Sequence, residues 1–206
     1  MKILLACEES QVVCKAFRDK GHEAYSCDIL ETSGDHPEWH IVGDVQAILN
    51  DGWDMMIAFP PCTRLTNSGV RWLAERDLWY DLKEAIKFWH SLAYAKEFGI
   101  KKMGFENPIP HKYAREGFRY VREESEENFF VKGIGKYTQI IQPWQFGHGE
   151  QKATCLWLTN LPKLKPTNIV TVREQKIWKM SPGPERSKLR SKTYQGIANA
   201  MADQWG

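Results

Sequence analysis

Short apolar runs alternate with amphipathic segments along the first half of the chain. Residues 3–6 and 54–59 are almost entirely apolar, a pattern typical of strands buried on both faces of a parallel sheet. Residues 23–27, 41–42 and 102–105 predict further strands. Residues 11–20 and 78–98 space their apolar side chains as one helix face does, and a short helix is expected up to residue 50. This alternation predicts an α/β fold, a Rossmann-like open and mostly parallel sheet with helices on both faces.

The second half is less regular. Residues 110–136 are polar and predict a loop excursion or an irregular helix, followed by strands at 138–143 and 154–158. Residues 161–184 carry four prolines and predict a long surface segment, whereas residues 193–205 show a helical pattern. The 206 residues suit a single domain, which we expect to span residues 1–206.

Composition excludes several classes of protein. The chain is 42% hydrophobic and 12% aromatic, far from a disordered composition. It has no apolar run of about 18 residues, as a membrane span requires. The first apolar run is too short for a signal peptide, so we expect a cytoplasmic protein, in the host cell if a virus encodes it. Five scattered cysteines with no C-x-x-C pair predict neither a disulfide framework nor a structural metal site.

Charge is nearly balanced overall but is unevenly distributed. Residues 151–206 contain ten basic and three acidic residues, although the whole chain has 28 basic and 26 acidic residues. A basic C-terminal quarter is suited to phosphate groups, as in nucleic acids. A solvated basic surface remains the alternative.

Polar and nucleophilic residues follow the predicted strands. In an open α/β sheet, ligands bind beyond the carboxyl ends of the strands. The strand ends here carry Cys7-Glu8-Glu9-Ser10, Asp28, Asp44, Pro60-Pro61-Cys62-Thr63 and Glu106-Asn107-Pro108. Carboxylates at the first strand ends suit a cofactor that contains a nucleoside, because they can accept hydrogen bonds from both ribose hydroxyls.

Cys62 is the candidate nucleophile, because two prolines hold the preceding backbone in a rigid turn. A cysteine thiol has an ordinary pKa of about 8.5, so a cation or a helix N-terminus must lower it. Arg64 and the Thr66-Asn67 pair are the local candidates. Glu106 follows the next predicted strand, and a nucleophile and an acid on neighbouring strand ends form a plausible catalytic pair.

These residues resemble the cytosine-C5 methyltransferase family. The family carries a Pro-Cys nucleophile motif, here Phe59-Pro60-Pro61-Cys62 followed by Asn67-Ser68-Gly69, and a Glu-Asn-Val motif, here Glu106-Asn107-Pro108. Three weaker similarities are Asp28 as the acidic ribose ligand, Gly43-Asp44-Val45, and the C-terminal stretch from Gln195 to Met201. The resemblance spans residues 1–160 and 190–206 and implies the fold of S-adenosylmethionine-dependent methyltransferases.

The resemblance also implies roles for individual residues. Cys62 and Glu106 are expected to be catalytic. The expected contacts to S-adenosylmethionine come from Cys7, Glu8, Asp28, Asp44, Pro60 and Asn199. The expected substrate side consists of Pro61, Asn67, Ser68, Asn107, Gln151 and Lys152, with Asn107 holding the loop rather than touching substrate.

The chain departs from the family in three places. The first motif, normally an aromatic residue followed by spaced glycines, reads Ala6-Cys7-Glu8-Glu9-Ser10. The Gln-x-Arg-x-Arg motif is reduced to Gln151 and the displaced cation of Lys152. A large recognition domain is missing, and a basic, proline-containing segment at 161–192 stands in its place, so the chain is similar to small phage-encoded members.

The resemblance implies methyl transfer to C5 of cytosine in DNA through a covalent bond from Cys62 to C6, with relaxed sequence preference. Two alternatives stay open: C5 methylation of a free cytosine nucleotide, and a non-catalytic nucleic-acid-binding protein on a decayed scaffold. Within segment 161–192, Trp178 between Lys176 and Lys179 suits a phosphate backbone and an unstacked base. A solvated connector with Trp178 in the core is the other interpretation.

Overall fold

The computed structural model describes residues 1–121, 128–175 and 190–206. Its strands are β1 (Lys2–Ala6), β2 (Glu23–Asp28), β3 (His40–Val42), β4 (Met55–Ala58), β5 (Lys102–Pro108), β6 (Gly117–Val121), β7 (Asn128–Lys132), β8 (Gln139–Ile141) and β9 (Thr154–Thr159). Its α-helices are α1 (Val12–Asp19), α2 (Trp72–Glu75), α3 (Trp79–Ala93), α4 (Lys112–Glu116) and α7 (Gln195–Trp205). Its 3₁₀-helices are η1 (Pro37–Trp39), η2 (Val45–Ile48), η3 (Asn67–Gly69), η4 (Tyr94–Phe98) and η5 (Pro143–Gln145).

One mixed sheet forms the centre of the molecule, with the strand order β3-β2-β1-β4-β5-β9-β8. The first five of these run parallel, whereas β9 is antiparallel to both β5 and β8. The chain moves outward from β1 to β2 and β3 and then returns to β4 on the other side of β1. This reversal between β1 and β4 is the switch point beside which open α/β sheets bind ligands. The Rossmann-like α/β fold expected from the sequence is confirmed.

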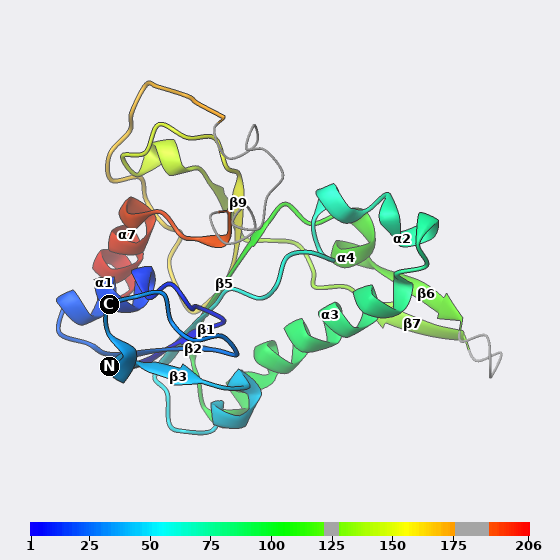
Figure 1. The fold of residues 1–206 in the computed structure, drawn as a ribbon, viewed down its shortest axis with the longest axis horizontal. Helices are drawn as coiled ribbons and strands as arrows, with labels where there is room; N and C mark the ends of the chain where they lie inside the picture. Colours follow the sequence, from blue (N-terminus) through cyan, green and yellow to red (C-terminus); the bar gives the residue numbers. More distant parts are fainter. Residues whose placement is uncertain (122–127, 176–189) are drawn as a thin grey trace.

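The sheet has a separate apolar core on each face, because successive side chains of a strand point to opposite sides. Leu4 and Ala6 of β1 belong to the core that α3 covers. Ile3 and Leu5 belong to the core beneath α1 and α7. These two helices lie side by side on their face of the sheet (Figure 1).

Most predicted elements are confirmed, but β5 is longer than expected. The sequence predicted a strand that ends at residue 105, with Glu106, Asn107 and Pro108 beyond it. In the structure these residues continue β5 and pair with β9, where Pro108 lies opposite Thr154. The prediction was wrong because an antiparallel partner from a distant part of the chain extends the strand.

The polar segment at 110–136 is also more ordered than expected. Within its described residues it forms α4 and the antiparallel hairpin of β6 and β7 rather than a loop. Trp79 of α3 contacts this excursion through the rings of Tyr113 and Phe118, at centroid distances of 5.1 and 5.4 Å. Together with α2, these elements form a lobe beside the sheet (Figure 1).

The first part of the basic segment, residues 161–175, is mostly exposed and contains no helix or strand. These residues come after β9 in the sequence and lie beside the loop that follows β8. Phe146 of that loop and Asn168 form a parallel bridge. The Arg173 guanidinium lies over the Trp144 ring, 3.8 Å from its centroid. Trp178 and the cations of Lys176, Lys179, Arg186 and Lys188 lie outside the described residues.

Across residues 1–121, 128–175 and 190–206, no helix combines the length and the apolar character needed to cross a membrane.

Candidate active site

The carboxyl ends of β4 and β5 bring Cys62 and Glu106 to the same edge of the sheet. The two strands are parallel neighbours, with Ala58 beside Phe105. Cys62 lies in the turn that follows β4, and Glu106 is the next residue after Phe105. The two groups are close enough that the Glu106 charge raises the pKa of the Cys62 thiol. The structure therefore brings together the pair that the sequence predicted.

Burial and three charged side chains act on the pKa of the Cys62 thiol. Burial raises the pKa of its thiol most, and Glu106 raises it further, whereas the cations of Lys152 and Arg190 lower it. Arg64, one of the two local candidates, is not among the charges that act on the thiol, and its guanidinium forms an ion pair with Asp81 at 2.9 Å. The cations that favour the thiolate come from the C-terminal quarter of the chain instead.

Glu106 sits where its acid form is favoured. Burial raises the pKa of its carboxyl group, while the Lys152 cation and a hydrogen bond with the Thr154 side chain lower it. Because burial is the largest influence, the carboxyl group holds its proton at a higher pH than an exposed glutamate does. Such a group can donate a proton to a substrate near neutral pH.

Asn107 ties the two strand ends together. Its side chain is 1% exposed, and Nδ2 donates a hydrogen bond to the Pro60 carbonyl at 2.9 Å. Asn107 thus holds the nucleophile loop through this bond, and its place on the substrate side stays a prediction. Its Oδ1 is buried and has no hydrogen-bond partner among the described residues.

Lys152 and Gln151, two of the predicted substrate residues, differ in where their side chains lie. Lys152 faces the site, as its influence on Cys62 and Glu106 shows, and its Nζ lies 5.9 Å from the centroid of the Tyr194 ring. Gln151 bonds elsewhere, because its Oε1 accepts a hydrogen bond from Gln175 Nε2 at 2.9 Å.

Three of the remaining substrate candidates lie on either side of Cys62 along the chain. Pro61, Asn67 and Ser68 are all exposed. Ser68 Oγ is 3.0 Å from Thr66 Oγ1, so these two hydroxyls share a hydrogen bond.

Sequence reasoning missed several residues that reach the site from distant elements. Arg190 and Tyr194 precede α7, Thr154 begins β9, and His111 caps α4. Only Arg190 had a signal, the excess of basic residues in the C-terminal quarter, and that signal did not say which cation returns to Cys62.

The ends of β1, β2 and β3 carry the predicted cofactor residues. Burial first, and then the charges of Asp28 and Asp44, raise the pKa of the Cys7 thiol to about 12, so all three groups are near one another. Asp28 is half-buried, and its Oδ1 accepts a hydrogen bond from the Leu30 backbone N–H at 3.0 Å. The Cys7 thiol stays neutral at physiological pH.

Glu8 makes contacts that the sequence did not predict. Its carboxylate is buried and accepts hydrogen bonds from the backbone N–H groups of Val13 at 2.6 Å and Cys14 at 3.0 Å. Both oxygens thus bind the first turn of α1, where helical N–H groups have no partner within the helix. Glu8 was expected to contact the cofactor, but the contacts observed are those of a helix cap.

Asp44 and Asn199 also have local partners. Asp44 is exposed and caps η2 by accepting a hydrogen bond from the Gln46 backbone N–H at 2.9 Å. Asn199 is exposed on α7, and its Oδ1 accepts from Gln195 Nε2 at 2.8 Å. Their contacts with a cofactor stay predictions, as do those of Cys7, Asp28 and the buried Pro60.

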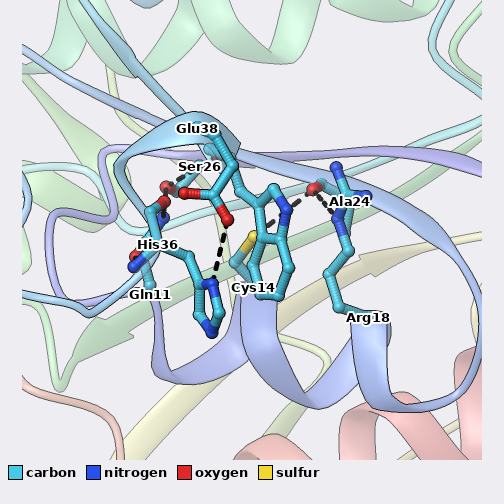
Figure 2. A network of polar contacts seen from close by, with 8 residues as sticks. Gln11, Cys14, Arg18, Ala24, Ser26, His36 and Glu38 are labelled. Atoms are coloured by element: carbon cyan, nitrogen blue, oxygen red, sulfur yellow. Dashed lines mark hydrogen bonds and ion pairs between the residues drawn. The ribbon is translucent and has the colours of Figure 1, made fainter.

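A polar network anchors the loop that follows Asp28. Figure 2 shows Gln11 at the start of α1 reaching His36. Gln11 Nε2 donates to the His36 carbonyl at 2.7 Å, and Gln11 Oε1 accepts from the His36 backbone N–H at 3.2 Å. On the same helix, Arg18 Nε donates to the Ala24 carbonyl at 2.7 Å. These hydrogen bonds connect β2 and the loop beyond it to α1. They hold the end of β2 that carries Asp28 in place.

A search against protein-family models and a search of the curated proteins each found no match to this chain.

Proposed function

We propose that this protein transfers a methyl group to C5 of cytosine in DNA, with Cys62 as the nucleophile and Glu106 as the acid. The observation that carries the proposal is the convergence of these two side chains at neighbouring strand ends, where the charge of one changes the pKa of the other. The fold supports the proposal, and so do the Lys152 and Arg190 cations, which lower the pKa of the Cys62 thiol.

The chemistry requires an activated ring, because C5 of cytosine is a weak nucleophile. In the proposed mechanism the Cys62 thiolate adds to C6 while Glu106 gives a proton to N3, so that C5 gains the electron density of an enamine carbon. S-adenosylmethionine, when bound, supplies the electrophilic methyl group that C5 takes up. N3 then returns its proton to Glu106, a base removes the C5 proton, and the Cys62 thiolate leaves as the C5–C6 double bond forms again.

The residues at the first strand ends fit S-adenosylmethionine. Asp28 offers a carboxylate for the ribose hydroxyls at the position where open α/β sheets place one. The next two residues, Ile29 and Leu30, are 76% and 60% exposed, an apolar surface beside the carboxylate that suits the flat face of an adenine. Asp44 would lie at the adenine, and Cys7 and Pro60 line the same edge of the sheet.

Polymeric DNA is favoured as substrate by the cations of the C-terminal quarter. Lys163, Lys165 and Arg173 are exposed along the described part of the basic segment, and Lys152 and Arg190 act on Cys62 itself. This distribution suits a phosphate backbone that continues beyond the target base. In a duplex, the base must leave the stack to reach Cys62, at a free-energy cost of a few kcal/mol.

The test combines methyl transfer with trapping of the adduct. The protein is incubated with S-adenosylmethionine labelled in the methyl group and with either duplex DNA or dCMP, and the labelled product is identified. Duplex DNA containing 5-fluorocytosine, which cannot lose its C5 substituent, should give a covalent adduct with the parent protein and with Cys14→Ala, but not with Cys62→Ala. Cys14 is a matched control because its thiol is on the buried side of α1, in the core on the face of the sheet opposite α3.

Each arm of this test has a separate meaning. Methylation of dCMP without methylation of DNA would replace the polymer by a free nucleotide. DNA binding without labelling or adduct would favour a non-catalytic protein. An adduct that persists in Cys62→Ala would contradict the assignment of the nucleophile.

A further inference from the structure

The turn that carries Cys62 is held on both sides by side chains of one other segment. Two residues before Cys62, the Pro60 carbonyl accepts a hydrogen bond from Asn107 Nδ2 at 2.9 Å. Two residues after it, the Arg64 carbonyl lies 2.8 Å from His111 Nε2. Asn107 and His111 are each 1% exposed, so both donor side chains are shielded from water.

Backbone contacts reinforce the second attachment. The His111 backbone N–H donates to the Leu65 carbonyl at 3.0 Å, and the Asn67 backbone N–H donates to the Ile109 carbonyl at 3.4 Å. Between these two hydrogen bonds, Thr66 forms an antiparallel bridge with Pro110. The stretch after Cys62 is therefore laid against the stretch after β5.

The hydrogen bonds define the tautomer of His111. Its Nδ1 accepts a hydrogen bond from the Ala114 backbone N–H at 3.0 Å, so Nδ1 carries no proton. The ring proton is then on Nε2, which donates it to the Arg64 carbonyl. Burial lowers the pKa of His111, which keeps this neutral form at physiological pH. The two ring nitrogens therefore have different roles, since Nδ1 caps α4 and Nε2 holds the Cys62 turn.

The sequence around Cys62 leaves few backbone groups that could hold the turn, so side-chain donors take on this role. Pro60 and Pro61 have no backbone N–H groups, so the backbone of these two residues can form hydrogen bonds only through its carbonyl oxygens. On the other side, the Cys62 carbonyl already accepts hydrogen bonds from the N–H groups of Leu65 and Thr66, at 3.0 and 3.2 Å.

We propose that His111 is a positioning residue for the reaction, which sets the place of the Cys62 thiol relative to Glu106 through its bond to the Arg64 carbonyl. This inference rests on the proposed function, in which Cys62 and Glu106 act on one cytosine ring. Glu106, Asn107 and His111 lie within six consecutive residues, so a single segment carries the acid and both attachments of the nucleophile turn.

Two substitutions separate the two roles of the imidazole. In His111→Asn the short amide can still cap α4, a position that favours asparagine, but it does not reach the Arg64 carbonyl. In His111→Gln the longer amide can donate to the Arg64 carbonyl but loses the cap. If positioning matters, H111N should form the 5-fluorocytosine adduct about 10- to 100-fold more slowly than the parent, with unchanged binding of S-adenosylmethionine. H111Q should keep the adduct rate within about threefold and should lower the melting temperature instead.

A second measurement does not depend on methyl transfer. The rate of Cys62 alkylation by iodoacetamide, followed by mass spectrometry of the Cys62 peptide, should rise at least about threefold in H111N, because a loosened turn exposes the thiol. It should stay near the parent rate in H111Q. If the parent methylates neither DNA nor dCMP, the proposed function fails, and the alkylation rates still report whether His111 holds the turn.

Three outcomes would overturn the inference. H111N could match the parent in both rates, or H111Q could lose as much adduct rate as H111N. Failure of either variant to fold would show that His111 supports the lobe as a whole rather than the position of the thiol.

Discussion

The Cα of Gly196 lies directly against the Phe146 carbonyl, so that a Cβ at this position would be 1.8 Å from the carbonyl oxygen. Through this contact, the first turn of α7 packs against the loop after β8. The Gly196 backbone N–H also donates to His148 Nε2 at 2.9 Å. The segment from Arg190 to Tyr194 immediately precedes this contact, so the contact restricts where the Arg190 side chain can lie.

Replacing Gly196 with alanine should therefore destabilise the protein, although alanine is the better helix former. The clash is with backbone atoms, which cannot move aside as a flexible side chain does, and overpacking of this kind costs about 1–3 kcal/mol. Unfolding in urea, followed by circular dichroism, measures the change. The control is Gly104→Ala in β5, where the new Cβ meets only ordinary contacts at 3.5 to 3.8 Å. Equal stability of the two variants would contradict this account of the α7 anchor.

Glu106→Gln should reduce turnover far more than it weakens cofactor binding. The amide keeps the shape of the side chain but cannot give a proton to N3, and a general acid contributes about 100-fold or more to a rate. Because that interaction grows in the transition state, kcat falls and the dissociation constant of S-adenosylmethionine stays within about twofold. Steady-state kinetics and calorimetry separate the two effects. Glu116→Gln, at an exposed ion pair with Arg115, is the matched control, and turnover of E106Q within twofold of the parent would refute the role.

The pH dependence of Cys62 alkylation should shift in opposite directions in two variants. The Glu106 carboxylate raises the pKa of the Cys62 thiol, so E106Q should move the alkylation profile to lower pH. The Lys152 cation lowers the same pKa, so Lys152→Gln should move the profile to higher pH. Iodoacetamide rates at Cys62 between pH 6 and 10 give both profiles. Shifts of the same sign would mean that these two charges do not act on the thiol as the geometry indicates.

Asp28→Ala should weaken S-adenosylmethionine binding by about tenfold or more, because the carboxylate would accept hydrogen bonds from the ribose hydroxyls, and such charged bonds contribute about 1.5–3 kcal/mol. Asp28→Asn is the companion variant, since an amide oxygen can still accept the Leu30 N–H that shapes the turn. Asp51→Asn serves as the control, because Asp51 lies at the opposite edge of the sheet, where its carbonyl accepts from Lys2 Nζ. Unchanged affinity in D28A would remove Asp28 from the cofactor site.

Local pattern was enough to predict much of this protein. Apolar runs with no polar face predicted β1 and β4, helical spacing predicted α1, α3 and α7, and both signals lie within a few consecutive residues. The pairing of Cys62 with Glu106 followed from the same reasoning, because the carboxyl ends of neighbouring parallel strands must meet at one edge.

The tertiary structure alone decided which groups surround that pair. Glu106 is inside a strand because β9 extends β5, and Arg64 is unavailable to the thiol because α3 presents Asp81 to it. Lys152 and Arg190 act on Cys62 from the far end of the chain, and His111 reaches its turn from the start of α4. Periodicity shows which side of an element is buried, but it carries no information about which distant segment will lie against it. That choice depends on how the whole chain satisfies its buried donors, acceptors and charges at once.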